Sequence, residues 1–248
     1  MQNNDATIFG IRAIIEAIQA GKTLEKIYIQ QNLQGNLFNE LNSLIKDLHI
    51  SNSYVPIEKL NHLTKNANHQ GVVAKISPIN FVDLENLLNE LSNQAITPLF
   101  LVLDQITDVR NFGAMIRTAE CCGVNAIIIP NQGNAPLNAD AIKTSAGAAF
   151  RVPICKVDHI KDALFLLQAS EIQLVAATEK TTHTIYEVDF KKPSALIMGS
   201  EDKGISNSVL KLGETKAKLP MLGTIESLNV SVACGVFLYE VIRQRFKM

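Results

Sequence analysis

The sequence predicts an α/β fold, in which a parallel sheet with helices on both faces follows a small α/β domain. From Pro98 onward, short continuous apolar runs alternate with helical stretches, which is typical of buried parallel strands joined by crossover helices. Before residue 77 the elements are shorter, and a stretch with Pro78 and a polar helix separates the two regions. We therefore expect a small domain at 1–76, a linker at 77–96 and a larger domain at 97–248.

The first domain alternates helices and strands. Apolar residues recur at helical spacing over 8–20, and Gly21 stands where a C-terminal cap would lie. The next predicted elements are a strand, a helix, a short strand, a helix and a strand, at 25–29, 37–48, 54–55, 58–63 and 71–76. Basic residues only just outnumber acidic ones in this domain, so its charge does not single it out as an RNA-binding domain.

The larger domain follows a linker whose leucines form one helical stripe over 82–94. We expect strands at its apolar runs, 99–104, 126–130, 151–157, 172–178 and 194–199. We expect helices at 111–122, 140–146, 160–169 and 206–212. A polar loop at 222–228 leads into a last helix, which begins near Asn229 and Ser231.

Composition limits the classes of function. The chain has 248 residues, 47% of them hydrophobic, and a formal net charge of -1, which argues against a protein held to nucleic acid by bulk positive charge. It has neither an apolar run of ~20 residues nor a signal-like start, so we expect a cytoplasmic protein. The cysteines lie in apolar surroundings without metal-site spacing and the five histidines are scattered, so we expect reduced core thiols and no metal site. The cysteines are Cys121, Cys122, Cys155 and Cys234.

Three polar clusters follow predicted strands, at 104–113, 199–204 and 222–229. Ligands of parallel α/β sheets bind beyond the carboxyl ends of the strands. We therefore expect the functional site where these three clusters meet.

Each cluster has a functional and a purely structural interpretation. Asn111 stands at a predicted helix start and Arg117 lies six residues later, where its guanidinium suits a phosphate; alternatively, Arg117 pairs with Glu120 or Asp108 on a capped helix. Glu201 lies between glycines that allow close backbone approach, as an ordinary turn would also require. The start of the last helix suits an anionic ligand, or is simply a capped helix.

Other enzyme classes are poorly supported. The sequence contains no GxGxxG or GxxxxGK[ST] motif, which argues against dinucleotide oxidoreductases and P-loop NTPases. It contains no HExxH or GxSxG motif either, which argues against metalloproteases and serine hydrolases.

Three segments carry a family resemblance. NFGAMIRTAE, IMGSEDKGIS and LPMLGTIESLNVSVA resemble, in order and spacing, the signature motifs of the SpoU/TrmH branch of the SPOUT RNA methyltransferases. This resemblance covers 98–248. IFGIRAIIEAI and NHQGVVA in the first domain resemble the family's N-terminal substrate-binding domain, and point to the subgroup that modifies a guanosine of 23S ribosomal RNA.

The resemblance implies a fold and an activity. It implies a deep trefoil knot in the C-terminal part of the chain, and methyl transfer from S-adenosylmethionine to a ribose 2′-hydroxyl. It also implies a homodimer with the site near the subunit interface.

The family's functional residues transfer to matching positions of this sequence. The resemblance implies catalytic roles for Asn111, Arg117, Glu201, Ser227 and Asn229. It implies cofactor contacts at Thr178, Gly199, Leu219, Met221, Leu222, Gly223 and Leu228. Two positions depart from the family pattern: Val109 replaces a frequent proline, and Arg12 replaces a frequent histidine.

We expect Arg117 to clamp the phosphate beside the target ribose and to stabilise charge on the 2′-oxygen. An arginine base is chemically awkward, because its pKa lies above ~12. Three other hypotheses stay open: a transfer RNA substrate, a non-catalytic RNA-binding or ribosome-assembly protein, and a small-molecule methyltransferase. The separate first domain and the guanidinium favour a phosphodiester substrate over a small molecule.

Overall fold

The computed structural model describes residues 7–225 and 227–246 and divides into two compact units. The first unit comprises Met1–Asn80 and Pro136–Ala139, and the second Phe81–Ala135 and Asp140–Met248. Each unit is described by itself.

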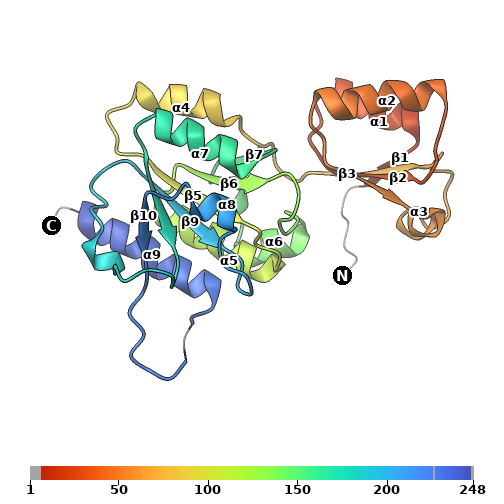
Figure 1. Cartoon of the computed structure of the whole chain (residues 1–248). Helices are drawn as coiled ribbons and strands as arrows, with labels where there is room; N and C mark the ends of the chain where they lie inside the picture. Colours follow the sequence, from red (N-terminus) through yellow and green to blue (C-terminus); the bar gives the residue numbers. More distant parts are fainter. Residues whose placement is uncertain (1–6, 226, 247–248) are drawn as a thin grey trace. The chain divides into compact units, whose positions relative to one another are not determined.

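The first unit contains a four-stranded sheet in the order β1-β4-β2-β3. Its elements are β1 (Thr7–Phe9), α1 (Ile11–Gln19), β2 (Leu24–Gln30), α2 (Asn36–Asp47), β3 (Asn52–Val55), α3 (Ile57–Thr64) and β4 (Val72–Ile76). Strand β4 runs antiparallel to both β1 and β2, whereas β3 runs parallel to β2. Helices α1 and α2 share a core with one face of this sheet, and α3 packs on the other face (Figure 1).

The prediction of one helix over 8–20 was wrong at its start. Residues Thr7–Phe9 form strand β1, which pairs with β4, and the helix begins only at Ile11. Gly10 separates the two elements with φ at 90°, a left-handed conformation that glycine adopts without steric cost. The apolar stripe of α1 therefore begins after this turn.

The second unit contains a six-stranded sheet in the order β10-β8-β9-β5-β6-β7, and every pairing in it is parallel. Its strands are β5 (Leu99–Asp104), β6 (Ala126–Pro130), β7 (Ile154–Val157), β8 (Gln173–Ala177), β9 (Ser194–Gly199) and β10 (Thr215–Ala217). Its helices are α4 (Leu84–Ser92), α5 (Val109–Cys121), α6 (Ala139–Thr144), α7 (Ile160–Ala169), α8 (Asn207–Leu210) and α9 (Val230–Arg245). Two short 3₁₀ helices lie at Ala148–Phe150 and Ile185–Glu187.

Helices cover both faces of this sheet. Helices α4 and α7 lie on one face, and α5 and α9 lie together on the other (Figure 1). Every residue of β5 and β9 is buried, as expected for central parallel strands. The predicted α/β class is therefore confirmed, while the knot implied by the family resemblance stays a prediction.

No helix among residues 7–225 and 227–246 combines the length and the apolar character needed to span a membrane. Burial of the thiols is also largely as expected, because Cys122, Cys155 and Cys234 are buried. Cys121 contradicts the expectation of a core thiol: it is exposed, since it lies in the last turn of α5 on the side away from the core. Burial raises the pKa of Cys122 to about 11 and that of Cys155 to about 12, so both thiols stay protonated near neutral pH.

Candidate functional site

The carboxyl ends of β5 and β9 lie side by side in the sheet, and their loops are joined by a buried carboxylate. Asp104 ends β5 and is only 4% exposed. Its Oδ2 accepts a hydrogen bond of 2.8 Å from the backbone N–H of Ser206, in the loop after β9. This bond holds the β9 loop beside the start of the chain segment that leads to α5.

The loop after β9 turns back on itself and leaves no room for a side chain at the last residue of the strand, Gly199. The N–H and C=O groups of Ser200 and Gly204 pair with each other at 3.1 and 2.9 Å. A Cβ atom at Gly199 would lie 2.1 Å from the backbone of Gly204 and Ile205, and Gly204 itself has φ at 66°. The loop therefore requires both glycines, and it carries Glu201 at its exposed tip.

Three side chains from the three predicted clusters form one hydrogen-bonded set, which we call the loop triad: Asn111, Glu201 and Asn229. Asn111 Nδ2 donates to Glu201 Oε2 at 3.1 Å, and Asn229 Nδ2 donates to Asn111 Oδ1 at 3.0 Å and to Glu201 Oε1 at 3.5 Å. The structure thus brings together segments separated by up to 118 positions in sequence.

Asn229 has a second role as the N-cap of α9. Its Oδ1 accepts hydrogen bonds from the N–H of Ser231 at 3.0 Å, from the hydroxyl of Ser231 at 2.6 Å and from the N–H of Val232 at 3.4 Å. These bonds satisfy N–H groups that have no partner within the helix. The side chain therefore uses its oxygen for the helix and its amide N–H₂ for the triad.

The expectation that Asn111 stands at the helix start needs correction. Helix α5 begins at Val109, and its N-cap is Asp108, whose Oδ1 accepts a hydrogen bond of 2.7 Å from the N–H of Asn111. Because a carboxylate already caps the helix, the Asn111 side chain is released toward Glu201. Val109 is accommodated as the first helical residue.

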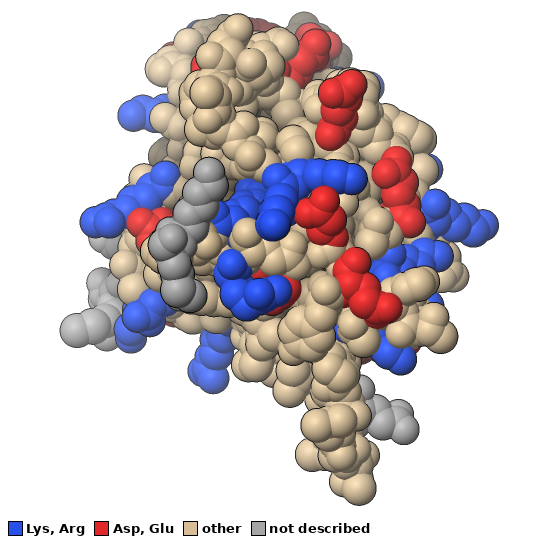
Figure 2. All heavy atoms as spheres, turned by 90° about the vertical axis from the view of Figure 1, so that its left-hand side faces the viewer, with Lys and Arg blue, Asp and Glu red and all other residues tan. Residues whose placement is uncertain are grey.

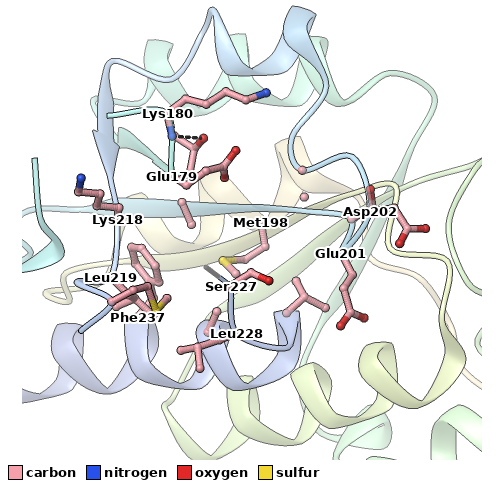
Figure 3. Close-up of a pocket in the computed structure, with 18 of the residues that line it drawn as sticks. Glu179, Lys180, Met198, Glu201, Asp202, Lys218, Leu219, Ser227, Leu228 and Phe237 are labelled. Atoms are coloured by element: carbon pink, nitrogen blue, oxygen red, sulfur yellow. Dashed lines mark hydrogen bonds between the residues drawn. The ribbon is translucent and has the colours of Figure 1, made fainter. Parts of the chain in front are cut away.

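A pocket of about 710 Å³ lies beside the loop triad, between α9 and the loops after β8, β9 and β10 (Figure 3). Most of the predicted cofactor positions line it, together with two of the predicted catalytic residues. These are Thr178, Gly199, Leu219, Met221, Gly223 and Leu228, with Glu201 and Ser227. Figure 3 shows Glu201 and Asp202 at one side of the pocket and Lys218 and Leu219 at the other. The pocket therefore combines an apolar floor, which includes Met198 and Phe237, with charged edges.

The structure does not bring every predicted site residue to this pocket. The side chain of Leu222 is 99% exposed and does not line it. Arg117 is exposed on α5, and it makes no hydrogen bond or ion pair with residues 7–225 or 227–246. The two alternative partners proposed for Arg117 are engaged elsewhere, since Asp108 caps α5 and Glu120 pairs with Arg151 at 3.6 Å. The guanidinium is thus available to a partner from outside the described chain.

Several lining residues were missed by the sequence analysis, among them Glu179, Lys180 and Lys218. Glu179 and Lys180 follow β8, whose end could have been added to the three clusters because it is also the carboxyl end of an apolar run. Lys218 follows β10, and no apolar run marked that strand. Among the described residues, no group of three or more His, Cys, Asp or Glu side chains is arranged to hold a metal ion.

Lys and Arg side chains lie among Asp and Glu side chains on the face of the molecule shown in Figure 2. This face forms no continuous basic surface, in agreement with the net charge of -1. Attraction of a polyanion to this face must therefore depend on local groups.

Comparison with known proteins gives two family matches. Residues 98–239 match the SpoU rRNA Methylase family, and residues 7–82 match the domain described as RNA 2'-O ribose methyltransferase substrate binding. The 23S rRNA (guanosine-2'-O-)-methyltransferase RlmB of Photorhabdus laumondii is 35% identical over 96% of this chain and 98% of its own length. YacO of Bacillus subtilis, a putative TrmH family tRNA/rRNA methyltransferase, is 32% identical over 96% of this chain and 95% of its own.

Solved structures give the same fold. The SpoU methyltransferase AviRb of Streptomyces viridochromogenes, in complex with AdoMet, superposes with a TM-score of 0.61 at 23% identity and covers 96% of this chain and 90% of its own. The TrmH/SpoU tRNA modifying enzyme of A. aeolicus is 32% identical with a TM-score of 0.55, and covers 65% of this chain and 82% of its own. The loop triad and the pocket thus lie on a scaffold that other methyltransferases share.

Proposed function

The chain belongs to the SpoU rRNA Methylase family. We propose that it transfers a methyl group from S-adenosylmethionine to the ribose 2′-hydroxyl of a guanosine in 23S ribosomal RNA. Relatives that match over nearly their whole length, and that carry this activity in their names, support the assignment. The structural observation that carries it is the loop triad, because three loops that are distant in sequence converge beside one pocket.

The pocket residues fit S-adenosylmethionine, which supplies a methyl group activated on a positively charged sulfur. Leu228, Met221 and Phe237 offer apolar surface for an adenine ring, and Gly199 lines the pocket without a side chain. Thr178, Leu219 and Gly223 complete the predicted contacts. Leu222 would contribute only through its backbone, since its side chain points into solvent. Glu201 places a negative charge at the edge where a cationic ligand would be favoured.

Arg117 is proposed to bind the phosphate next to the target ribose and to stabilise negative charge on the attacking 2′-oxygen. Arg117 has no partner among residues 7–225 and 227–246, which supports this role, because an unpaired guanidinium keeps all five N–H donors for a ligand. Asn111, Asn229 and Glu201 would hold the loops in register, and Ser227 would act at the pocket wall. Correct positioning supplies a large share of the rate in such a transfer.

We also propose that the chain works as a homodimer through α9. Val232, Val236 and Tyr239 recur at helical spacing on α9 and are 52%, 40% and 58% exposed. A second copy that buried this apolar stripe would remove it from water. Because α9 begins at the loop triad, the site would lie near such an interface.

We propose different roles for the two parts of the chain. Residues 1–76 would bind RNA, 77–96 would link the domains and 97–248 would carry the transfer; the match of 7–82 to a substrate-binding domain supports this. The main rival substrate is transfer RNA, supported by the likeness to the A. aeolicus enzyme, which covers only 65% of this chain. We also propose a cytoplasmic location, which an RNA substrate supports.

Methyl-tritiated S-adenosylmethionine would test the activity. We expect label in 23S rRNA transcripts and an alkali-resistant linkage after one guanosine, because methylation of the 2′-oxygen removes the internal nucleophile. Label confined to transfer RNA would support the rival substrate. Binding of S-adenosylmethionine and RNA without transfer would identify a non-catalytic RNA-binding protein.

Arg117→Ala is expected to lower methyl transfer at least ~100-fold, because the transition state loses its electrostatic partner. Calorimetric binding of S-adenosylmethionine should stay within about twofold of wild type, since Arg117 does not line the pocket. Arg151→Ala is a matched control. The Arg151 side chain is 77% exposed, and among the described residues its only ion pair is with Glu120. Near wild-type transfer by the Arg117 variant would contradict the assignment.

A further inference from the structure

One face of the first unit's sheet is only partly covered. Phe9, Val73 and Tyr28 are cross-strand partners on β1, β4 and β2, so their side chains project from the same face. Val73 and Tyr28 pack with Leu60 of α3, whereas Phe9, on the edge strand, is 38% exposed. An aromatic side chain therefore remains open to solvent beside the part of the face that α3 covers.

Two lysines surround the Tyr28 ring on this face. Lys26 Nζ lies 5.7 Å and Lys59 Nζ 5.1 Å from the ring centroid. Lys26 comes from β2 and Lys59 from α3, so the ring fixes two ammonium groups that belong to different elements. No ion pair joins either lysine to a carboxylate in the described part of the chain.

This arrangement favours an anionic ligand. The ring attracts each ammonium group but carries no net charge, so the two positive charges still repel one another. Anionic groups bound at the two ammonium groups would relieve this repulsion and accept hydrogen bonds from them. Tyr28 thus acts as a positioning residue, because it holds the lysines without neutralising them.

We propose that this face binds a single-stranded segment of the RNA substrate, with backbone phosphates at Lys26 and at Lys59 and a base stacked on Phe9. Adjacent strands lie about 4.8 Å apart, so Phe9 and Tyr28, two strands apart, are separated by about 10 Å. A chain that alternates phosphates with planar bases matches a surface on which cations adjoin an aromatic ring. The inference rests on the proposed function for the choice of RNA, and it assigns the contact surface within the first unit.

Fluorescence anisotropy of the full-length protein with a labelled 12-nucleotide oligouridylate, at several salt concentrations, tests the proposal. The double variant Lys26→Gln/Lys59→Gln should bind less tightly, and the slope of log Kd against log salt should fall by about 1.4. Phe9→Ala should weaken binding at least ~5-fold and leave the salt slope unchanged, because stacking releases no counterions.

Tyr54→Ala is the matched control. Tyr54 is 54% exposed on β3 and pairs with Ile29, so it projects from the opposite face of the same sheet. This variant should bind like wild type, and circular dichroism melts should show that all variants fold. Wild-type affinity and salt slope in the Phe9 and lysine variants would overturn the proposal.

Two further outcomes separate this inference from the proposed function. If oligoglutamate competes as well as oligouridylate and Phe9→Ala has no effect, the surface fits an acidic protein and the RNA proposal is overturned. If the variants lose RNA binding as expected but wild type methylates no RNA, the surface is supported and the proposed transfer fails instead.

Discussion

Asn229 joins two structures through the two ends of one amide group. Its oxygen caps α9 and its nitrogen bonds to Asn111 and Glu201. The substitution Asn229→Asp separates these two roles. Aspartate is an equally good N-cap, but its carboxylate cannot donate a hydrogen bond to Asn111 or Glu201. We expect this variant to keep the stability of wild type within about 1 kcal/mol. Transfer should fall about 10- to 100-fold, because the introduced carboxylate faces Glu201 and misplaces the loops.

The measurement pairs urea unfolding with single-turnover methylation. Ser231→Ala is the control, because it removes only the hydroxyl bond to Asn229 Oδ1 and leaves the triad intact. Full activity in Asn229→Asp would show that the triad does not organise the site.

Gly199 and Gly223 both line the pocket but differ in the space around them. A Cβ at Gly199 would meet backbone at 2.1 Å, whereas a Cβ at Gly223 would meet no atom within 4 Å. We expect Gly199→Ala to lower the free energy of unfolding by about 2 kcal/mol or more, because backbone cannot give way as a flexible side chain does. Gly223→Ala should change it by less than about 0.5 kcal/mol. Equal unfolding midpoints in urea for the two variants would refute this difference.

At the residue scale, sequence reasoning identified the groups but not all of their surroundings. Motif matching placed Glu201 and Asn229 in one site, and the structure joins them by a hydrogen bond. It could not foresee that Asp108 caps α5, since aspartate and asparagine are both good N-caps and lie only three positions apart. It also could not foresee that Leu222 faces solvent, because an exposed loop has no periodicity.

At the scale of elements, α9 is fastened at both ends. Asn229 caps its start, and near its end Arg245 donates hydrogen bonds to four backbone carbonyls, those of Thr97, Pro98, Phe190 and Lys192. These carbonyls precede β5 and β9, so the helix end is tied to the amino edge of the sheet. Burial lowers the pKa of Arg245, yet the guanidinium stays charged at neutral pH.

The last turns of α9 also contain a buried carboxylate that makes stability depend on pH. Glu240 is 6% exposed and accepts hydrogen bonds from Arg243 at 2.7 and 2.8 Å and from Gln244 at 2.8 Å. The bond from Arg243 is the main reason that the pKa of Glu240 lies below its ordinary value of 4.5. The ionised form therefore stabilises the fold, fully above pH 4.5 and progressively less as pH falls through the folded-state pKa.

Glu240→Gln is expected to remove this dependence. The variant should be less stable than wild type at pH 7, and the difference should shrink as pH falls below 4.5. Urea unfolding at pH 7, 5, 4 and 3.5 measures it. Parallel pH curves for the two proteins would mean that Glu240 does not contribute as described.

The strands that sequence reasoning predicted and those it missed differ in burial. The runs at β5, β6 and β9 are buried along their whole length, so their apolar composition shows directly. Strand β10 has only three residues, Thr215–Ala217, at the edge of the sheet, and two of them are polar. Strand β1 is equally short and lies at the edge of the first sheet. Edge strands with one neighbour leave little pattern in the sequence.

At the scale of the whole molecule, order along the chain does not predict order in space. The sequence indicated two domains and a parallel sheet, but β8 and β9 lie between β10 and β5. This crossover depends on which faces pack together, and many arrangements satisfy the same apolar pattern. The hydrogen bond between Asn111 and Asn229 spans 118 positions for the same reason.

The apolar stripe of α9 predicts the state of association. Val236→Asp with Tyr239→Asp should convert the proposed homodimer to a monomer, because two carboxylates would have to lose their hydration at the interface. Methyl transfer should fall with dimer content, since the helix begins at the loop triad and a site near the interface would lose its support. Sedimentation velocity at several protein concentrations measures the association.

Phe165→Asp separates this effect from a general loss of apolar surface. Phe165 is 53% exposed on α7, which covers the opposite face of the sheet from α9 (Figure 1). Its substitution should leave the sedimentation coefficient unchanged if the two copies meet through α9. If instead the α9 variant sediments like wild type while the Phe165 variant dissociates, the copies meet through the α7 face, and the exposure of the α9 stripe must have another cause.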